Sequence, residues 1–366
     1  MTYRIKKIVS IICLAAAICA ITLLPASGYA ENLRFVFMAD SRGNYPVPPN
    51  PPINTDVLTA INNKIVKLNP LPSFVIFGGD QAYRGCIDGK YTFDDFKTAM
   101  QRLTDAKITL YTAIGNHELY VKGATDDQGF ILANQQEFQT AFASNPANGP
   151  AGYTPSYDHL VYSFESPGHD AFFAVLDPYF LTADVPNPDL GGTIDSNQLA
   201  WLQAQLAQTK ATHKFLFIHV PYYSVFDDPN EPTPDHDATW TQLWSILDNN
   251  NFDLFCCGHT HLYSRKNINS SIAPNPQPTP PIQWKGNVFQ LLCGTCGVRV
   301  STGTPKVNPI LWHVSNAADT YFFSVVDICG TQVTVNSYKG NTGAYTVFDT
   351  FTVKYPLSPV NFLLLD

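Results

Sequence analysis

The sequence predicts an α/β protein in which strands and amphipathic helices alternate along most of the chain. Short apolar runs typical of buried strands occur at residues 33–37, 74–77, 108–114, 214–218 and 252–257. Each run ends in polar residues, and segments with helical spacing separate most of them. Because ligands bind outside the carboxyl ends of strands in open α/β sheets, the pattern also predicts a functional site at these ends.

Four segments carry apolar side chains at the spacing of a helix that packs one face against a core. They span residues 56–68, 95–103, 195–207 and 237–247. Leu199, which belongs to the third segment, shows the pattern, since Leu202 and Leu206 follow it at helical intervals. We therefore expect core-facing helices between the strands.

The last part of the chain is expected to contain strands only. Residues 322–328, 332–338 and 345–353 are apolar runs separated by glycine-containing turns, which is typical of antiparallel strands. The sequence contains no internal repeat and no interdomain linker. Residues 31–366 are therefore expected to form a single domain.

Residues 1–30 have the features of a secretory signal peptide. Three basic residues precede an apolar stretch over residues 8–24, and residues 28–30 offer small side chains at the positions that a signal peptidase recognises. The alternative is an uncleaved anchor, because the stretch approaches the ~20 residues that span a bilayer. Cleavage predicts a secreted or periplasmic protein that begins near Glu31, with no other membrane segment.

Composition restricts the classes of partner. The chain has 366 residues, 45% of them hydrophobic, which is typical of a globular protein with a large core. Its net charge of −8, with no basic run after the N-terminus, disfavours a nucleic-acid surface. An acidic chain can still bind an anionic substrate, because bound dications dominate the local field. The sequence does not predict an oligomeric state.

The cysteines outside the N-terminal segment are expected to form some disulfides if the protein is exported, although the sequence cannot assign the pairs. Cys293 and Cys296 are expected to form a loop disulfide or to pack as small residues. Zinc binding is disfavoured because no second pair completes a site. Cys256 and Cys257 are adjacent on one strand, so they should face different cores.

Polar blocks with metal-binding side chains follow the five strand runs. They are Asp40-Ser41-Arg42, Gly78-Gly79-Asp80, Gly115-Asn116-His117-Glu118, His219 and Gly258-His259-Thr260-His261. Hydrolysis of a phosphate ester requires neutralisation of its oxygens and hydroxide near neutral pH, and two dications ~3.5–4 Å apart supply both. One carboxylate can bridge such a pair, and Asp80 is the candidate. A mixed set of Asp, Asn and His favours Fe, Mn or Zn.

In this order the five blocks resemble those of the calcineurin-like metallophosphoesterase superfamily, over about residues 33 to 300. The resemblance implies a four-layer α/β/β/α sandwich in which two mixed sheets are flanked by helices. It also implies that the C-terminal strands, residues 321–353, complete the second sheet.

The resemblance further implies two metal positions that share one carboxylate. The ligands implied for the first position are Asp40, Asp80 and His261. The ligands implied for the second position are Asp80, Asn116, His219 and His259. His117 matches the family histidine that contacts the phosphate and protonates the leaving group. Glu118 and Asp253 are expected to be structural groups or groups behind the ligands, where they could orient ligand histidines.

The first block departs from the family pattern Asp-x-His, because position 42 is arginine and the first metal position lacks a ligand. The stretch from Gly79 to Tyr83 matches the Gly-Asp-x-x-Tyr form of the purple acid phosphatase branch, in which tyrosinate binds ferric iron. Tyr83 is therefore a candidate ligand. Alternatively it packs under the metal loop or donates a hydrogen bond to Asp40 or substrate. Arg42 either faces the phosphate as a fixed cation or forms a structural salt bridge.

These observations predict an exported binuclear metal-dependent phosphoesterase that hydrolyses small phosphate mono- or diesters by metal-activated hydroxide. The alternative function is a catalytically weakened protein of the same fold that binds metal or phosphoesters, which the missing histidine at position 42 suggests. A structural protein is disfavoured because it would not need this set of metal-binding residues.

Overall fold

The chain divides into two units, residues 1–31 and residues 32–366, and every described residue belongs to the second unit. The computed structural model describes residues 32–43, 53–83, 93–120, 131–166, 168, 170–182, 191–223, 238–269, 283–286, 288–300, 312–314 and 320–354. The predicted signal peptide and Cys86 lie outside these residues. None of the described helices has both the length and the apolar character needed to cross a membrane.

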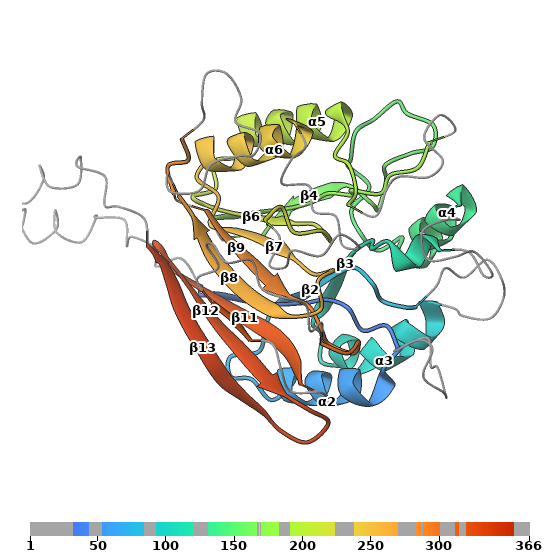
Figure 1. Ribbon diagram of the computed structural model, residues 1–366, viewed down its shortest axis with the longest axis vertical. Coiled ribbons are helices and arrows are strands. Elements are labelled where there is room, and N and C mark those ends of the chain that lie inside the picture. Colours follow the sequence, from blue (N-terminus) through green and yellow to red (C-terminus); the bar gives the residue numbers. More distant parts are fainter. Residues whose placement is uncertain are drawn as a thin grey trace, which may run out of the picture. The chain divides into compact units, whose positions relative to one another are not determined.

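Two mixed sheets form the centre of the second unit (Figure 1). The six-stranded sheet has the order β13 (Tyr345–Lys354), β12 (Gln332–Gly340), β11 (Tyr321–Cys329), β1 (Leu33–Met38), β2 (Phe74–Gly78) and β3 (Thr109–Ala113). In it, β1, β2 and β3 run parallel, and the other neighbours run antiparallel. The C-terminal strands therefore join the sheet that contains the first strand of the domain, so the expectation that they complete the second sheet is wrong.

The second sheet has seven strands. Their order is β10 (Trp312–Val314), β8 (Tyr263–Ile268), β9 (Val288–Cys293), β7 (Leu254–Cys257), β6 (His213–Phe217), β5 (Ala171–Val175) and β4 (Tyr162–Glu165). The neighbours β5, β6, β7 and β9 run parallel, so their carboxyl ends lie at one edge. The strands predicted from the apolar runs are confirmed.

Helices cover the outer faces of both sheets (Figure 1). They are α2 (Thr55–Ile65) and α3 (Phe93–Asp105) on the six-stranded sheet, and α5 (Ser196–Gln208) and α6 (Ala238–Asn249) on the seven-stranded sheet. All four were predicted, with ends that differ by a few residues. The predicted architecture of two mixed sheets flanked by helices is confirmed.

One helix, α4 (Leu132–Ala141), was not predicted. Of its residues only Asn134, Gln135 and Phe138 are buried, so it lacks the apolar periodicity by which the other helices were recognised. Its position depends on polar contacts instead. The Asn134 amide donates to the carbonyl oxygens of Leu119 and Tyr120, each at 3.1 Å. The helix thereby anchors the loop that follows β3.

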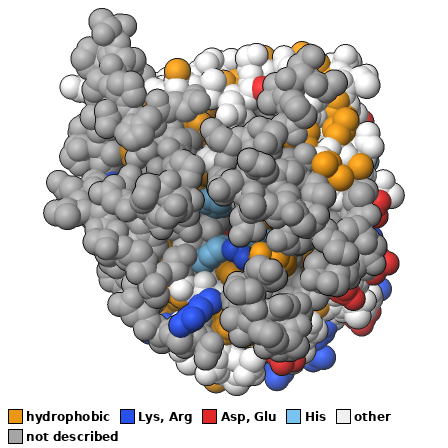
Figure 2. Space-filling view, turned by 45° about the vertical axis from the view of Figure 1, so that its right-hand side comes forward, with side chains coloured by type: hydrophobic (Ala, Val, Ile, Leu, Met, Phe, Trp, Pro, Cys, Tyr) orange, Lys and Arg blue, Asp and Glu red, His pale blue; other side chains and the backbone are white. Residues whose placement is uncertain are grey.

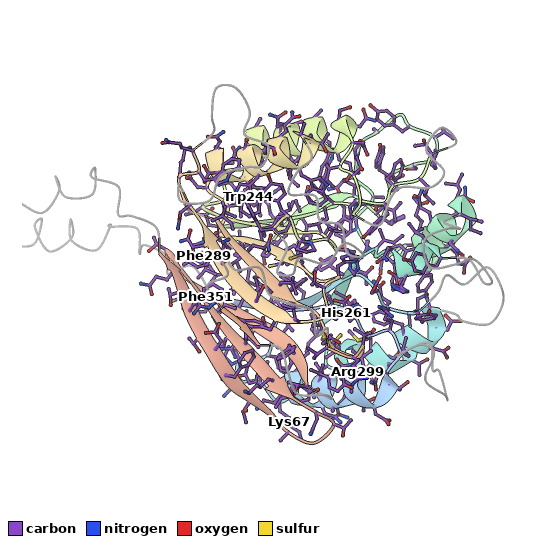
Figure 3. The ribbon with its side chains drawn as sticks, in the orientation of Figure 1. Lys67, Trp244, His261, Phe289, Arg299 and Phe351 are labelled. Atoms are coloured by element: carbon purple, nitrogen blue, oxygen red, sulfur yellow. The ribbon has the colours of Figure 1, made fainter. Side chains whose placement is uncertain are left out.

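The core between the sheets is rich in phenylalanine. Phe35 of β1 packs edge-on against Phe173 and Phe215 of the other sheet, with ring centroids 5.4 and 5.2 Å apart. Phe289 and Phe351 make a further contact between the sheets, at 5.2 Å (Figure 3). Burial of each such ring contributes roughly 1.5–3 kcal/mol, so these contacts hold the strand ends of the two sheets together.

The described cysteines do not form disulfides. Cys256, Cys257, Cys293, Cys296 and Cys329 are free thiols, and all but Cys329 are buried. The expectation of disulfides is therefore wrong for these five residues. Cys256 and Cys293 pack in the core between the sheets, whereas Cys257 and Cys296 pack in the outer core. This confirms that Cys256 and Cys257 face different cores and shows that the pair at 293 and 296 packs as small residues.

A buried histidine connects the two sheets at the end opposite to the polar blocks. Both ring nitrogens of His213 face oxygen atoms, Nδ1 at 3.2 Å from Asp253 Oδ2 and Nε2 at 2.8 Å from the carbonyl of Gly330. Burial lowers the pKa of His213, but the hydrogen bond and charge of Asp253 and the Gly330 carbonyl outweigh it, so the pKa is raised overall. The pair favours the folded state when His213 is protonated.

Replacement of this side chain by His213→Gln is expected to change how stability depends on pH. Because the folded-state pKa is raised, the contribution of His213 is fully present below the ordinary histidine pKa of about 6.5 and is lost as pH rises through the folded-state pKa. The variant should be less stable by roughly 1–3 kcal/mol below pH 6.5, and the difference should shrink above it. Urea unfolding at a series of pH values measures this, and parallel profiles would contradict it.

Candidate metal centre

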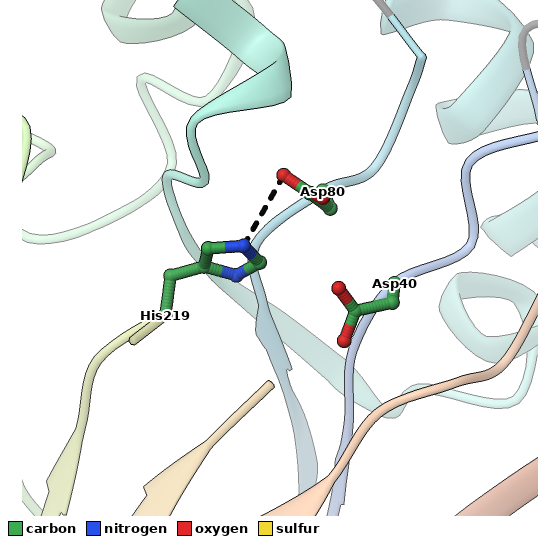
Figure 4. Close-up of side chains that lie close together, drawn as sticks. All are labelled: Asp40, Asp80 and His219. Carbon is green, nitrogen blue, oxygen red and sulfur yellow. Dashed lines mark ion pairs between the residues drawn. The ribbon is translucent and has the colours of Figure 1, made fainter. Parts of the chain in front are cut away.

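The polar blocks meet where the carboxyl ends of strands from both sheets come together. Asp40 follows β1, Asp80 follows β2 and His219 follows β6. Their ligand atoms all lie within 4.8 Å of one another, and all three side chains are buried (Figure 4). The structure therefore brings together side chains from both sheets in one cluster.

Backbone hydrogen bonds tie the loops of this cluster to one another. The amide of Asp40 donates to the carbonyl of Gly79 at 3.0 Å, and the amide of Gly258 donates to the carbonyl of His219 at 2.9 Å. The amide of His259 donates to the Asp40 carboxylate, 3.1 Å from Oδ2. The loops of the separate blocks therefore hold one another in position.

Four candidate ligands adopt a left-handed backbone conformation that L-residues rarely occupy. The φ angles are 64° for Asp40, 56° for Asp80, 71° for His259 and 48° for His261. Such a residue costs on the order of 1–3 kcal/mol, and strain of this kind concentrates at functional sites. The strain turns each side chain toward the centre and is offset by the contacts between the loops.

His219 presents an unprotonated nitrogen to a carboxylate. Its Nδ1 donates to the carbonyl of Gly78 at 2.8 Å, so Nε2 carries the lone pair of the neutral ring. Burial lowers the pKa of His219 to about 3, which keeps the ring neutral near pH 7. Yet Nε2 lies only 3.3 Å from Asp80 Oδ1 (Figure 4). A lone pair and an ionised carboxylate oxygen repel at this distance, and a cation bound to both atoms removes this repulsion.

Two further side chains present buried atoms without hydrogen-bond partners. Within the described residues, His259 Nε2 and Asn116 Oδ1 have none. Burial, and then the charge of His219, lower the pKa of His259 to about 3, so its ring is also neutral. The amide nitrogen of Asn116 donates to the Tyr120 hydroxyl at 3.0 Å, which fixes the orientation of the amide. This role of Tyr120 was not predicted, and its only signal in the sequence is its spacing of four residues from Asn116.

The two carboxylates at the centre are close and fully buried. Burial raises the pKa of Asp40 well above its usual range, and the charge of Asp80 raises it further. Burial likewise raises the pKa of Asp80. A bound cation would favour the ionised forms of both groups. Together with the unpartnered atoms of Asn116, His219 and His259, this donor set fits a metal ion.

Arg42 contacts the carboxylate proposed to bridge two ions. Its Nε donates to Asp80 Oδ2 at 3.2 Å, and its Nη2 lies 3.2 Å from His261 Nε2. The side chain is mostly buried, with 13% of its surface exposed. Arg42 therefore makes the salt bridge that was its alternative role, and a contact with substrate remains a prediction.

His117 and Tyr83 lie beside this pair. The His117 ring places Nδ1 2.7 Å from the Tyr83 carbonyl and Nε2 3.9 Å from Asp80 Oδ2. Burial, and then the charge of Arg42, hold the pKa of His117 well below its usual range. The buried Tyr83 ring has its centroid 5.3 Å from that of His117 and 5.7 Å from Arg42 Cζ. Its role as a metal ligand remains a prediction.

The two acidic residues expected to orient ligand histidines act differently. Glu118 accepts hydrogen bonds from the backbone amides of Gly115 at 2.7 Å, Asp80 at 2.9 Å and Ala82 at 3.1 Å. It therefore holds two metal-binding loops through their backbones. Asp253 contacts His213. Asp253 precedes β7, whereas the candidate ligands follow their strands, so Asp253 lies at the other end of the sheet. Both residues are therefore structural groups, as expected, but their contacts are with backbone amides and with His213 and not with a candidate ligand histidine.

The cluster reaches the surface on one face of the molecule. Figure 2 shows histidine side chains together with a neighbouring Lys or Arg side chain near the middle of this face. His117 and His259 are 8% and 9% exposed, respectively, while Asp40 and His219 are fully buried.

The family model for calcineurin-like phosphoesterases matches residues 33–263, which is more than half of the chain. The chain therefore belongs to this family, a class of metal-dependent phosphoesterases. The resemblance seen in the five polar blocks is confirmed. Comparison with curated protein sequences finds no significant match.

Three solved structures share the fold at low sequence identity. A purple acid phosphatase from seeds of yellow lupin (Lupinus luteus) has a TM-score of 0.59 and 16% identity, over 90% of this chain and 55% of that chain. A dimetal phosphatase from Danio rerio has a TM-score of 0.56 and 14% identity, over 88% and 99%. The GAP50 anchor of the Plasmodium inner membrane complex has a TM-score of 0.51 and 17% identity, over 91% of this chain and 93% of that chain. Since this chain spans only 55% of the lupin protein, the likeness establishes the fold alone.

Glu118→Gln is expected to destabilise the protein by roughly 1–3 kcal/mol, because an amide NH₂ would face a backbone N–H that now donates to the carboxyl group. Burial, and then the charge of Asp80, raise the pKa of Glu118 to about 8, while the three amide donors oppose this shift. Chemical unfolding measures the effect. The control is Glu137→Gln on the exposed face of α4, which should have wild-type stability. Equal stability of both variants would show that Glu118 does not hold the loops.

Proposed function

We propose that the protein hydrolyses small phosphate mono- or diesters at the centre formed by Asp40, Asp80 and His219. The observation that carries the proposal is the neutral Nε2 of His219 at 3.3 Å from the Asp80 carboxylate in a buried setting. This arrangement calls for a cation, and membership of the phosphoesterase family supplies the reaction class. Fe, Mn and Zn suit the mixed donor set.

The side chains that would hold an ion are Asp80, Asn116, His219 and His259, since the last three carry the buried atoms without partners. A bound ion supplies Lewis-acid stabilisation of phosphate oxygens and lowers the pKa of bound water. The second ion of the expected binuclear centre, with ligands Asp40 and His261, remains a prediction.

His117 is placed to act on the leaving group. Its Nδ1–H is held by the Tyr83 carbonyl, so a proton that it gains or gives is carried at Nε2. Burial and Arg42 keep the free ring neutral near pH 7, so we propose that a bound phosphate dianion raises its pKa and makes it a general acid. His117 thereby contributes in the transition state without building the centre.

Two variants distinguish a residue that binds the metal from a residue that acts only in the reaction. Asp80→Asn should lose metal and hydrolysis together, because Asp80 contacts both His219 and Arg42. His117→Ala should keep its metal and lose about 10²–10⁴-fold in turnover, the usual contribution of general acid–base catalysis. Metal content and rates on phosphomonoester and diester panels measure both effects. The exposed Asp56→Asn serves as control, and equal metal loss in the two site variants would refute the assigned roles.

The contact between Arg42 and Asp80 favours one second candidate, a protein that binds metal or phosphoesters without efficient turnover. The guanidinium donates a hydrogen bond to Asp80 Oδ2, which makes this oxygen less available to a metal ion. The same assays decide between the two functions. Metal-loaded wild-type protein that binds its ion but hydrolyses no ester of either panel would establish the binding protein.

We also propose that the protein is exported, on the basis of the basic and apolar residues before position 31. The mature chain is expected to begin near Glu31 and to be secreted or periplasmic. Intact-mass measurement of protein from the producing cell tests this expectation, because removal of the signal peptide gives a defined mass loss. A full-length chain in the membrane fraction would contradict cleavage.

A further inference from the structure

The two metal positions implied by the family pattern differ in what their ligand atoms contact. At one position, Asn116 Oδ1, His219 Nε2 and His259 Nε2 are buried and lack hydrogen-bond partners in the described part of the chain. At the other position, the atoms that an ion would need contact Arg42. Nε of Arg42 is 3.2 Å from Asp80 Oδ2, and Nη2 is 3.2 Å from His261 Nε2. Within the described residues, the first position thus presents donor atoms without partners, whereas at the second position Asp80 Oδ2 and His261 Nε2 are in contact with Arg42.

The chemistry of the guanidinium determines the direction of both hydrogen bonds. Arginine has N–H donors and no acceptor, so His261 Nε2 must accept the bond with its lone pair. That lone pair is the one through which Nε2 would bind a metal. Arg42 therefore donates hydrogen bonds to candidate ligand atoms from two separate blocks, Asp80 Oδ2 and His261 Nε2.

The buried negative charge of Asp40 and Asp80 also explains why a cationic side chain lies at position 42. The Asp40 carboxylate is fully buried, and one of its oxygens lies 3.7 Å from His261 Nε2, on the side of the cluster that Arg42 contacts. The guanidinium keeps its positive charge at any pH that the protein tolerates. A dication at this position would be repelled by it. The guanidinium instead supplies a permanent single charge beside Asp40 and Asp80.

We propose that the centre holds one metal ion, bound by Asp80, Asn116, His219 and His259, and that the guanidinium of Arg42 takes the place of a second ion. This inference rests on the proposed metal centre and specifies its composition. Arg42 is then a positioning residue that fixes the Asp80 carboxylate for the single ion and neutralises the buried acids.

The position of Tyr83 agrees with this composition. Arg42 Cζ lies 5.7 Å from the centroid of its ring, within the range of a cation–π contact. The ring of a neutral tyrosine stabilises a neighbouring guanidinium. Under this proposal Tyr83 packs against Arg42 and does not bind an ion as tyrosinate.

The test counts the ions bound by purified protein with and without the guanidinium. Wild-type protein and Arg42→His are stripped of metal, reloaded with excess Zn²⁺, desalted and analysed by plasma mass spectrometry. We expect one ion per chain in the wild type and two in Arg42→His, because imidazole restores the ligand of the family pattern Asp-x-His and removes the competing charge. Arg102→His, an exposed replacement on α3, is the matched control and should bind one ion.

Spectroscopy gives a second readout that does not depend on activity. Mn²⁺-loaded wild type should show the electron paramagnetic resonance spectrum of isolated ions, whereas Arg42→His should show that of an exchange-coupled pair. Iron-loaded wild type should lack a tyrosinate-to-iron charge-transfer band. A band that Tyr83→Phe abolishes would place an ion beside Tyr83 and overturn the proposal.

The stoichiometry distinguishes failure of this proposal from failure of the proposed function. Two tightly bound ions in the wild type would overturn the single-ion centre even if the protein hydrolyses phosphoesters. One ion in both wild type and Arg42→His would overturn the assignment to Arg42. One ion in the wild type and two in Arg42→His, without turnover on either substrate panel, would support this proposal and refute hydrolysis.

Discussion

The arrangement of the centre depends on one contact, between the neutral Nε2 of His219 and the carboxylate of Asp80 at 3.3 Å. His219 is oriented by the carbonyl of Gly78, which precedes the loop of Asp80, so the imidazole and the acid cannot turn away from each other independently. Both groups are buried, and water therefore does not screen the repulsion between a lone pair and an anion. A cation between them converts this repulsion into attraction. The two sheets bring these groups together, because Asp80 follows β2 of one sheet and His219 follows β6 of the other.

The two sheets position the centre by placing strand ends from each at one edge. Phe35 packs against Phe173 and Phe215 across the sheet interface, so the rigid core holds β1 close to the strands of the other sheet. The loops beyond the strands pass through strained left-handed conformations, and backbone hydrogen bonds between them compensate for that strain. Glu118 adds three bonds to backbone amides. The site is therefore preorganised by contacts among its own loops as well as by the sheets.

Arg42 changes the electrostatics of the family's centre. A guanidinium can neutralise a buried carboxylate and orient it, but it cannot act as a Lewis acid or lower the pKa of a water molecule as a metal ion does. Substitution of a cationic side chain for an ion would therefore preserve charge balance while concentrating the metal chemistry at a single position. His117 lies beside Asp80, with its Nε2 3.9 Å from Asp80 Oδ2.

The sequence by itself determined the fold class, the strands formed by the recognised apolar runs and four of the helices, because those runs have distinct periodicities. The order of the five polar blocks indicated the family. The strands β4, β5, β8, β9 and β10 were not predicted. The sequence also missed α4, which is held by Asn134 and Gln135 instead of an apolar stripe. It also did not identify the partners of Glu118 and Asp253, which are backbone amides and His213. Only the tertiary structure decided which lone pairs lack partners and that Arg42 contacts Asp80 and His261, 38 and 219 residues away in the chain. Those contacts depend on which loop ends the folded sheets bring within hydrogen-bond distance, and local sequence patterns carry no information about such distances.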